Sequence, residues 1–237
     1  MNSFNGERRK TILIVGASRG LGHAMALEFV KKGWHVVGTV RTGGRTDLHA
    51  LADANPGQIM IEPLDITEPE QISAVHERLR GRVLDILFVN SGIADRDASI
   101  PAVKAETDEF VQVMLTNALG VMRAVEGLED LVGADGLIGV MSSGQGSIAN
   151  NTRGGFEVYR ASKAALNQLM RSYAARHADD PRATVLMAPG WIRTGLGGPN
   201  ATFSIEETVP TLVGTLLVQR GKPGLRFIDR FGETVPW

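Results

Sequence analysis

Short apolar runs alternate with longer stretches of helical period along nearly the whole chain. Apolar runs of strand length, separated by helical segments, are typical of a parallel sheet with helices on both faces. The predicted strands are Thr11–Val15, His35–Val40, Gln58–Glu62, Leu84–Asn90, Leu137–Ser142, Ala183–Ala188 and Leu225–Ile228. The predicted helices are Leu21–Lys32, Pro69–Arg80, Asp108–Asp130, Glu157–Ala178 and Ile205–Arg220. We therefore expect a doubly wound α/β fold with a mostly seven-stranded parallel sheet flanked by helices.

Several predicted helix ends carry ordinary boundary signals. Thr67 and Glu70 have the spacing of a capping box, which predicts Thr67 as the N-cap of the helix that follows. Gly33 and Gly221 stand where two helices should end, because glycine adopts the left-handed conformation that commonly closes a helix. The boundary signals agree with the apolar pattern.

The composition is that of a globular protein with one large core. The chain has 237 residues, 43% of them hydrophobic, and no linker-like change in composition divides it. We expect a single domain over residues 11–237, preceded by an N-terminal extension of residues 1–10. The 25 Lys and Arg residues balance 26 Asp and Glu residues without a long run of one sign, which argues against nucleic-acid and polybasic membrane surfaces.

Other function classes are disfavoured by missing residue types and segments. The chain has no cysteine, so it has no disulfide, thiolate metal cluster or cysteine nucleophile. His23 and His35 lack the acidic or histidine neighbours of a metal site, and we predict no metal. No apolar stretch reaches the length of a membrane span or follows the first ten residues as a signal peptide would. We expect a cytoplasmic protein whose partners are small molecules or other proteins.

A glycine-rich loop follows the first predicted strand and leads directly into a helix. Its glycines are Gly16, Gly20 and Gly22. Glycine lets the backbone approach a pyrophosphate, and the free N–H groups of the following helix attract its negative charge. A tight strand-to-helix turn without a ligand would also use glycine, so this loop alone leaves both interpretations open.

The end of the second predicted strand favours one dinucleotide over another. An NAD-binding site usually has an acidic residue here for the ribose hydroxyls, but residues 38–42 contain no carboxylate and include Arg41. A guanidinium can bind a 2′-phosphate through paired hydrogen bonds, so Arg41 and Arg19 predict NADP(H), with NAD(H) as the alternative. Two solvated surface arginines would give the same pattern.

A serine, a tyrosine and a lysine form the candidate catalytic group. Ser143 follows a predicted strand, and Tyr159 and Lys163 lie four residues apart on one face of a predicted helix. In hydride transfer to a carbonyl, the Tyr159 phenol would donate the proton, and Lys163 would lower the pKa of that phenol and hold the nicotinamide ribose. Ser143 would donate a hydrogen bond to the substrate oxygen as charge develops.

Taken in order along nearly the whole chain, these motifs resemble the short-chain dehydrogenase/reductase family. The glycine spacing, G-x-x-x-G-x-G, is the family's pattern, although Val15 stands where the family usually has threonine, and one customary side-chain hydrogen bond is missing. Asn90-Ser91-Gly92 is similar to the family's Asn-Asn-Ala-Gly element, with the first Asn and the Gly retained. The resemblance implies a single Rossmann-type domain and an oxidoreductase acting on CH–OH groups with NADP as acceptor.

The resemblance also implies a role for each matching residue. Asn117 would anchor a water in the proton path to the lysine, and Ser143 would contact substrate in preference to Ser142. Asp65 would bind the adenine, although it could instead cap a helix. The catalytic set is Asn117, Ser143, Tyr159 and Lys163. The cofactor-binding set is Gly16, Ser18, Arg19, Gly20, Leu21, Gly22, Arg41, Asp65, Ile66, Asn90, Ser91, Gly92, Tyr159, Lys163, Pro189, Gly190, Ile192 and Thr194.

Three further segments resemble the C-factor and sniffer-type carbonyl reductase branch. They are residues 142–148, 199–201 and 232–237. The branch implies either a carbonyl reductase or a signalling protein that binds dinucleotide with incidental catalysis, and both interpretations stay open. The substrate pocket would come from Ile93–Pro101, Gly144–Phe156 and Trp191–Phe203, whose apolar residues favour an apolar aldehyde, ketone or quinone.

The long predicted helix Asp108–Asp130 has apolar residues over more of its surface than one stripe. A helix that buries a single face needs a narrower stripe, so a second face should meet a partner. Symmetric pairing through this helix and Glu157–Ala178 would bury it. We expect a homodimer or homotetramer.

Overall fold

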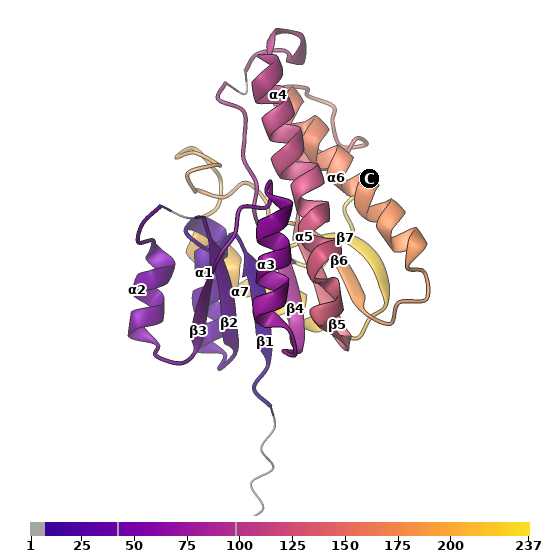
Figure 1. The fold of residues 1–237 in the computed structure, drawn as a ribbon. Coiled ribbons are helices and arrows are strands. Elements are labelled where there is room, and N and C mark those ends of the chain that lie inside the picture. The colour runs from indigo at the N-terminus through magenta and orange to yellow at the C-terminus, as the bar shows by residue number, and fades with distance from the viewer. Residues whose placement is uncertain (1–7, 42, 98) are drawn as a thin grey trace, which may run out of the picture.

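Seven parallel strands form one sheet in the order β3-β2-β1-β4-β5-β6-β7 (Figure 1). The computed structural model describes residues 8–41, 43–97 and 99–237. The strands are β1 (Thr11–Val15), β2 (His35–Val40), β3 (Ile59–Pro63), β4 (Leu84–Val89), β5 (Val132–Met141), β6 (Ala183–Ala188) and β7 (Gly224–Asp229). Every neighbouring pair is parallel. The predicted seven-stranded Rossmann-type sheet is confirmed.

Helices cover both faces of the sheet (Figure 1). The α-helices are α1 (Gly20–Lys31), α2 (Asp47–Ala54), α3 (Pro69–Leu79), α4 (Thr107–Met114), α5 (Gly120–Leu128), α6 (Glu157–Arg176) and α7 (Ile205–Gln219). Residues of α3, α5 and α6 pack in one core cluster, and residues of α1, α2 and α7 pack in the other. Leu13 belongs to the first cluster and Ile14 to the second, because successive side chains of a strand point to opposite faces.

The direction in which the strands are added changes beside β1. From β1 the chain adds β2 and β3 on one side and then β4 to β7 on the other. In open parallel sheets, ligands bind where this reversal opens a crevice at the carboxyl ends of the strands. The loops after β1 and β4, which contain Gly16 and Asn90, therefore meet at one place. The segment α4 extends beyond this edge of the sheet (Figure 1).

Several predicted elements differ in extent from the observed ones. Predicted helix Asp108–Asp130 is three joined segments, because a π-helical turn, η2 (Leu115–Leu119), separates α4 from α5. Strand β5 begins earlier than predicted, at Val132, and α2 was not predicted at all. Short 3-10 turns complete the structure at η1 (Ala102–Lys104), η3 (Glu129–Leu131) and η4 (Gly144–Gly146).

The predicted capping box before α3 is wrong, whereas the glycine stops are confirmed. Glu68 takes the N-cap position, Pro69 is the first helical residue, and no side chain caps the helix. Thr67 instead donates its N–H and hydroxyl to Asp65, at 2.9 and 2.7 Å, because the aspartate closes a turn one residue earlier. Gly33 and Gly221 follow α1 and α7 with φ of 79° and 71°.

Parts of the predictions fall on residues outside the described ranges. These are residues 1–7 of the N-terminal extension, Thr42 after β2 and Ala98 in the first substrate segment. Within the described ranges, no helix is both long enough and apolar enough to cross a membrane.

Candidate active site

The glycine loop after β1 is closed against β2 and β4. The Gly16 N–H donates to Thr39 Oγ1 at 2.9 Å, and Asn90 Nδ2 donates to Gly16 O at the same distance. A Cβ on Gly22 would lie 2.1 Å from Gly16 O, so glycine is required for this turn. Thr39, on the neighbouring strand, thus supplies a side-chain hydrogen bond to the loop, although Val15 cannot.

The start of α1 presents N–H groups that no side chain of the described residues caps. Arg19 occupies the N-cap position in an extended conformation, no side chain caps the helix, and its first turn has no acidic residue. The first N–H groups of a helix need a partner and favour an anion. Gly20 has φ of 58°, and a Cβ there would meet only Thr194 Cγ2, at 3.9 Å. Backbone, charge and space at this turn therefore fit a phosphate group.

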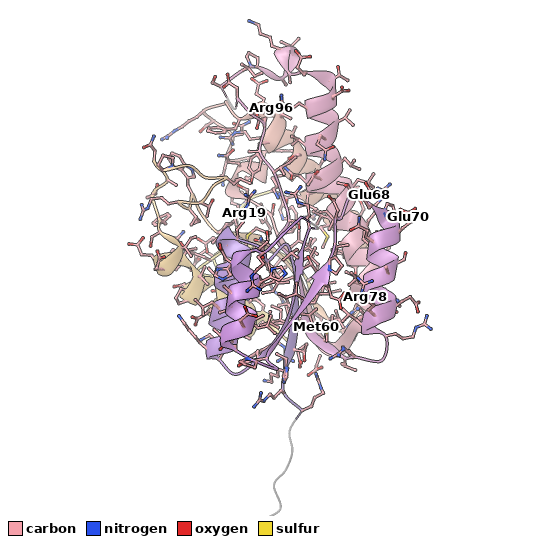
Figure 2. The ribbon with its side chains drawn as sticks, turned by 60° about the vertical axis from the view of Figure 1, so that its left-hand side comes forward. Arg19, Met60, Glu68, Glu70, Arg78 and Arg96 are labelled. Atoms are coloured by element: carbon pink, nitrogen blue, oxygen red, sulfur yellow. The ribbon has the colours of Figure 1, made fainter. Side chains whose placement is uncertain are left out.

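An open hollow of about 710 Å³ lies beside the glycine loop. It is lined by Ser18, Arg19, Arg41, Gly43, Gly44, Arg45, Thr46, Asp47, Asp65, Glu68 and Gln71. Figure 2 shows Arg19 and Glu68 at the same end of the sheet. The structure thus brings the predicted residues Ser18, Arg19, Arg41 and Asp65 together. Arg45 was not predicted, although a second arginine so soon after β2 could have signalled it.

Asp65 has a structural task in addition to any contact with a ligand. Its Oδ1 accepts two hydrogen bonds from Thr67, and its N–H donates to Gln71 Oε1 at 2.8 Å. The next residue, Ile66, is buried in the core beneath α3 and α5. The alternative that Asp65 caps a helix is therefore wrong, since α3 has Glu68 at its N-cap and Asp65 instead closes a turn with Thr67, while its carboxylate still lines the hollow.

Ser143, Tyr159 and Lys163 come together from β5 and α6. The Ser143 hydroxyl is close enough to the Tyr159 phenol to lower the pKa of that phenol. Lys163 is buried, its Nζ donates to Met141 O at 3.0 Å, and Nζ lies 5.9 Å from the centre of the Tyr159 ring. A Cβ on Gly92 would lie 3.4 Å from Lys163 Nζ, so the loop after β4 also borders the cluster of Ser143, Tyr159 and Lys163.

The two neighbouring serines have different surroundings. Ser142 is buried, and its hydroxyl donates to Asn167 Oδ1 at 2.6 Å. Ser143 is partly exposed and accepts from the Gln145 N–H at 3.1 Å, at the start of η4. The choice of Ser143 for the substrate contact agrees with this geometry, since Ser142 is committed to packing.

Asn117 connects three parts of the site. It is fully buried on the π-helical turn η2. Its side-chain amide donates to Ile93 O and accepts from Ile93 N–H, both at 2.8 Å, and donates to Ser162 Oγ at 2.9 Å. π-Helical turns are frequent at functional sites because the extra residue reorients the side chains. Ser162 was missed by sequence reasoning, although it is a small polar residue between Tyr159 and Lys163.

The loop after β6 closes the site from the other side. Gly190 has φ of 95°, Ile192 is buried, and Thr194 Oγ1 accepts from Gly197 N–H at 3.0 Å. Arg230 Nη1 donates to Pro189 O at 3.0 Å, and the Arg230 guanidinium lies 3.9 Å from the centre of the Phe203 ring. Arg230 was also missed, because it is distant in sequence from every motif of the site.

The profile of the short chain dehydrogenase family matches residues 10–203. This chain belongs to that family. Its curated relatives include the C-signal of Myxococcus xanthus, which is 33% identical over 158 residues, 65% of this chain and 93% of the C-signal. The resemblance to this branch, seen first in short motifs, is confirmed over most of the C-signal's length.

Solved structures of similar chains share the whole fold. A chain from Burkholderia multivorans, designated a short-chain dehydrogenase/reductase with bound NADP, is 62% identical with a TM-score of 0.96, covering 97% of this chain and 100% of that one. A carbonyl reductase from Pseudomonas aeruginosa PAO1 in complex with NADP is 32% identical with a TM-score of 0.89, with the same coverage. Both are similar to this short-chain dehydrogenase from end to end.

Burial sets the protonation of Tyr159 and Lys163 in this short-chain dehydrogenase. It raises the pKa of the Tyr159 phenol to about 12, and the nearby Ser143 hydroxyl offsets only part of that rise. Burial lowers the pKa of the Lys163 ammonium to about 8. The lowering of the pKa of Tyr159 by Lys163, whose Nζ lies 5.9 Å from the centre of the Tyr159 ring, stays a prediction. With a pKa of about 12, Tyr159 is protonated at neutral pH.

The three predicted substrate segments each begin next to a candidate site residue. Residues 93–97 and 99–101 follow the backbone that Asn117 holds, residues 144–156 follow Ser143, and residues 191–203 follow Gly190. Large apolar side chains on them are exposed, among them Ile148, Phe156, Trp191 and Leu196. The last segment is closed at its base by a bridge between Ile192 and Phe203. These segments present an apolar rim beside a polar catalytic group.

Proposed function

We propose that this chain is an NADP(H)-dependent carbonyl reductase that transfers hydride between the nicotinamide and an apolar aldehyde, ketone or quinone. One observation carries the proposal. The Ser143 hydroxyl is close enough to the Tyr159 phenol to lower its pKa, and both lie beside the buried Lys163 at the carboxyl edge of the sheet. A phenol, an ammonium and a hydroxyl so placed suit proton transfer to a carbonyl oxygen.

The residues around the glycine loop would hold the dinucleotide. The start of α1, from Gly20, would bind the pyrophosphate, and Arg19, Arg41 and Arg45 would surround a 2′-phosphate. The two similar structures named above, which hold NADP, support this choice over NAD. On the nicotinamide side the contacts would come from Asn90, Ser91, Gly92, Tyr159, Lys163, Pro189, Gly190, Ile192 and Thr194.

In reduction, Tyr159 would donate its phenolic proton to the substrate oxygen. When bound, the nicotinamide supplies the hydride that reaches the carbonyl carbon. The pKa of about 12 keeps the phenol protonated until negative charge develops on that oxygen, and Ser143 donates a second hydrogen bond to it. Lys163 stabilises the phenolate that remains, and Asn117 would hold a water through which the proton is replaced. In oxidation each proton transfer runs in reverse.

The proposal is tested by titrating the protein with NADPH and NADH and then measuring reduction of aromatic aldehydes, quinones and ketones. We expect NADPH to bind more tightly than NADH and at least one apolar carbonyl compound to be reduced. Absence of binding by both dinucleotides at millimolar concentration would reject the function outright.

A second candidate is a signalling protein that binds dinucleotide and catalyses only incidentally. Similarity to the C-signal of Myxococcus xanthus favours it. The presence of every proposed catalytic residue favours the enzyme, since a protein relieved of catalysis could lose Tyr159 or Lys163. If the Tyr159→Phe variant still binds NADPH and still supports the protein's biological phenotype, the signalling role would be favoured.

We also propose self-association through α4, η2, α5 and α6. The exposed large apolar residues on these elements are Phe110, Val111, Leu119 and Leu169. A second copy of the chain would cover them in a symmetric homodimer or in a homotetramer. Light scattering at micromolar concentration is expected to give a multiple of the 25.4 kDa chain mass, and a monomer would contradict this.

A further inference from the structure

Asp95 is a buried carboxylate without a partner. Both of its side-chain oxygens are buried, and neither accepts a hydrogen bond from any part of the chain that the structure describes. Removing a carboxylate from water without compensation is costly, so such a group calls for an explanation. A ligand that donates to the carboxylate would provide the missing interaction.

The backbone on either side of Asp95 is held in place. Two residues before it, Ile93 exchanges two hydrogen bonds with Asn117. One residue after it, the Arg96 N–H donates to Glu109 Oε1 on α4 at 2.5 Å, and Figure 2 shows Arg96 near the end of α4 that extends beyond the sheet. Two residues span at most about 7 Å, so Asp95 stays close to the backbone that Asn117 fixes.

A second buried acceptor lies on another predicted substrate segment, the one that follows Ser143. Gln145 Oε1 is buried and has no hydrogen-bond partner within the described ranges. The Gln145 N–H donates to Ser143 Oγ, and a Cβ on the next residue, Gly146, would lie 3.0 Å from Lys163 Cβ. Gln145 therefore bonds to Ser143 and directly precedes a glycine that packs closely against Lys163.

The remaining unpartnered atoms lie elsewhere. Among the described residues they belong to Thr208, Gln219 and Arg220, in α7 or at its end. The three orphaned oxygens of Asp95 and Gln145 are thus the only ones of this kind on the predicted substrate segments of the described chain. All three are acceptors, so their common complement is a hydrogen-bond donor.

We propose that Asp95, assisted by Gln145, determines substrate specificity by accepting hydrogen bonds from a donor group on the carbonyl substrate. This inference rests on the proposed carbonyl reductase function and adds to it. An ammonium is the best complement, because it balances the charge of a desolvated carboxylate while donating to it. The substrate class is therefore an apolar, aromatic or aliphatic, carbonyl compound that carries an amine.

The test compares two substrates that differ by one charged donor. 4-(Dimethylaminomethyl)benzaldehyde is protonated at neutral pH, and 4-isobutylbenzaldehyde has the same shape without the ammonium. The 3-substituted isomers of both compounds place the substituent at a second position relative to the carbonyl group. With saturating NADPH, the wild-type ratio of kcat/KM should favour the ammonium compound by about 10- to 100-fold. A ratio near one for both isomer pairs would overturn the inference.

Variants identify the residue that causes the preference for the ammonium substrate. Asp95→Asn should lower that ratio at least 10-fold, and Gln145→Met should lower it less, about 3-fold. Asp108→Asn removes an exposed carboxylate from the start of α4 and should keep the wild-type ratio. Asp95→Asn should unfold at the same or a higher temperature, since it removes a buried charge. An unchanged ratio in Asp95→Asn, or a loss of NADPH affinity in its place, would overturn the assignment.

Failure of the proposed function is recognised separately. If the wild type reduces none of these aldehydes and none of the quinones and ketones named above, the carbonyl reductase proposal fails. The inference is then decided by the affinity of N,N-dimethylbenzylamine for the NADP⁺-bound protein, measured by calorimetry. Tighter binding to the wild type than to Asp95→Asn would uphold it, and equal affinities would overturn it.

Discussion

The side-chain amide of Asn117 donates to the Ser162 hydroxyl across 2.9 Å, and Ser162 in turn donates to the carbonyl of Tyr159 at 2.7 Å. This pair ties the π-helical turn η2 to α6, the helix that carries Tyr159 and Lys163. Because Asn117 also binds both backbone groups of Ile93, one amide fixes the distance between the loop after β4 and the catalytic helix.

Ser162→Ala is expected to reduce turnover and stability together. It leaves a buried N–H of Asn117 without its acceptor, which should lower the free energy of unfolding by about 1–3 kcal/mol. Displacement of Tyr159 should lower kcat by about 10-fold, as mispositioned groups commonly do. Urea unfolding and steady-state kinetics measure both. Ser172→Ala, at an exposed serine of the same helix, is the control and should change neither; equal effects in the two variants would contradict the positioning role.

Gly22→Ala is expected to disrupt the glycine loop. The added Cβ would lie 2.1 Å from Gly16 O and 2.7 Å from Asn90 Nδ2, so backbone must move. We expect destabilisation of about 1–3 kcal/mol and loss of dinucleotide binding. Gly214→Ala is the matched control in another helix, because a Cβ on Gly214 would meet nothing within 4 Å. This variant should be more stable than the wild type by up to about 1 kcal/mol. Wild-type NADPH affinity in Gly22→Ala would contradict the role of this turn.

The sheet and its catalytic edge were predictable because they rest on local patterns. Strands β1, β2 and β6 have the predicted bounds, since each is a short apolar run buried on both faces. The order of these runs brings the loops after β1 and β4 together, and the four-residue spacing of Tyr159 and Lys163 places both on one face of α6. These inferences need no knowledge of long-range contacts.

The parts that were missed depend on contacts between distant residues. Arg230 reaches Pro189 from the far end of the chain, and Thr39 reaches Gly16 from the neighbouring strand. The cap predicted at Thr67 failed because Asp65 takes the threonine's donors into a turn of its own. Such choices are decided by competing hydrogen-bond partners in the folded chain, and spacing alone does not rank those partners.

Arg41→Asp is expected to invert the preference between dinucleotides. A carboxylate would repel a 2′-phosphate but could accept bonds from ribose hydroxyls, so NADPH affinity should fall at least about 10-fold relative to NADH. Fluorescence titration with both dinucleotides gives the ratio. Arg226→Asp makes the same charge change on β7, at the far edge of the sheet from β2, and should leave the ratio unaltered. An unchanged ratio in Arg41→Asp would mark Arg41 as a solvated surface residue.

Lys163→Met should remove a specific pH dependence from the stability of the protein without cofactor. Burial lowers the pKa of Lys163 to about 8, against 10.5 unfolded, so between these values the unfolded state binds more protons. Stability of the wild type relative to the variant should therefore rise with pH, by about 2 kcal/mol between pH 8 and 9.5. Urea unfolding across this range tests it, with the exposed Lys222→Met as control. A pH-independent difference would contradict the buried ammonium.

Tyr159→Phe gives the most direct test of the proposed chemistry. It deletes one oxygen and keeps the ring, so the packing of α6 and the dinucleotide site should remain. If the phenol donates the proton, NADPH affinity should change little while kcat falls by about 10²- to 10⁴-fold, the range typical of losing a general acid. Measurements of NADPH binding, thermal stability and carbonyl reduction on one preparation would compare the three effects.

A structural role for the hydroxyl predicts a different result. If the phenol only bonds to the nearby Ser143, loss of that one bond should cost on the order of 1 kcal/mol of stability and leave turnover nearly intact. Tyr173→Phe is the matched control, because Tyr173 is a buried tyrosine of the same helix whose hydroxyl binds Glu129, outside the site. It should lose stability and retain kcat. Near-normal turnover in folded Tyr159→Phe would therefore reject Tyr159 as the catalytic acid.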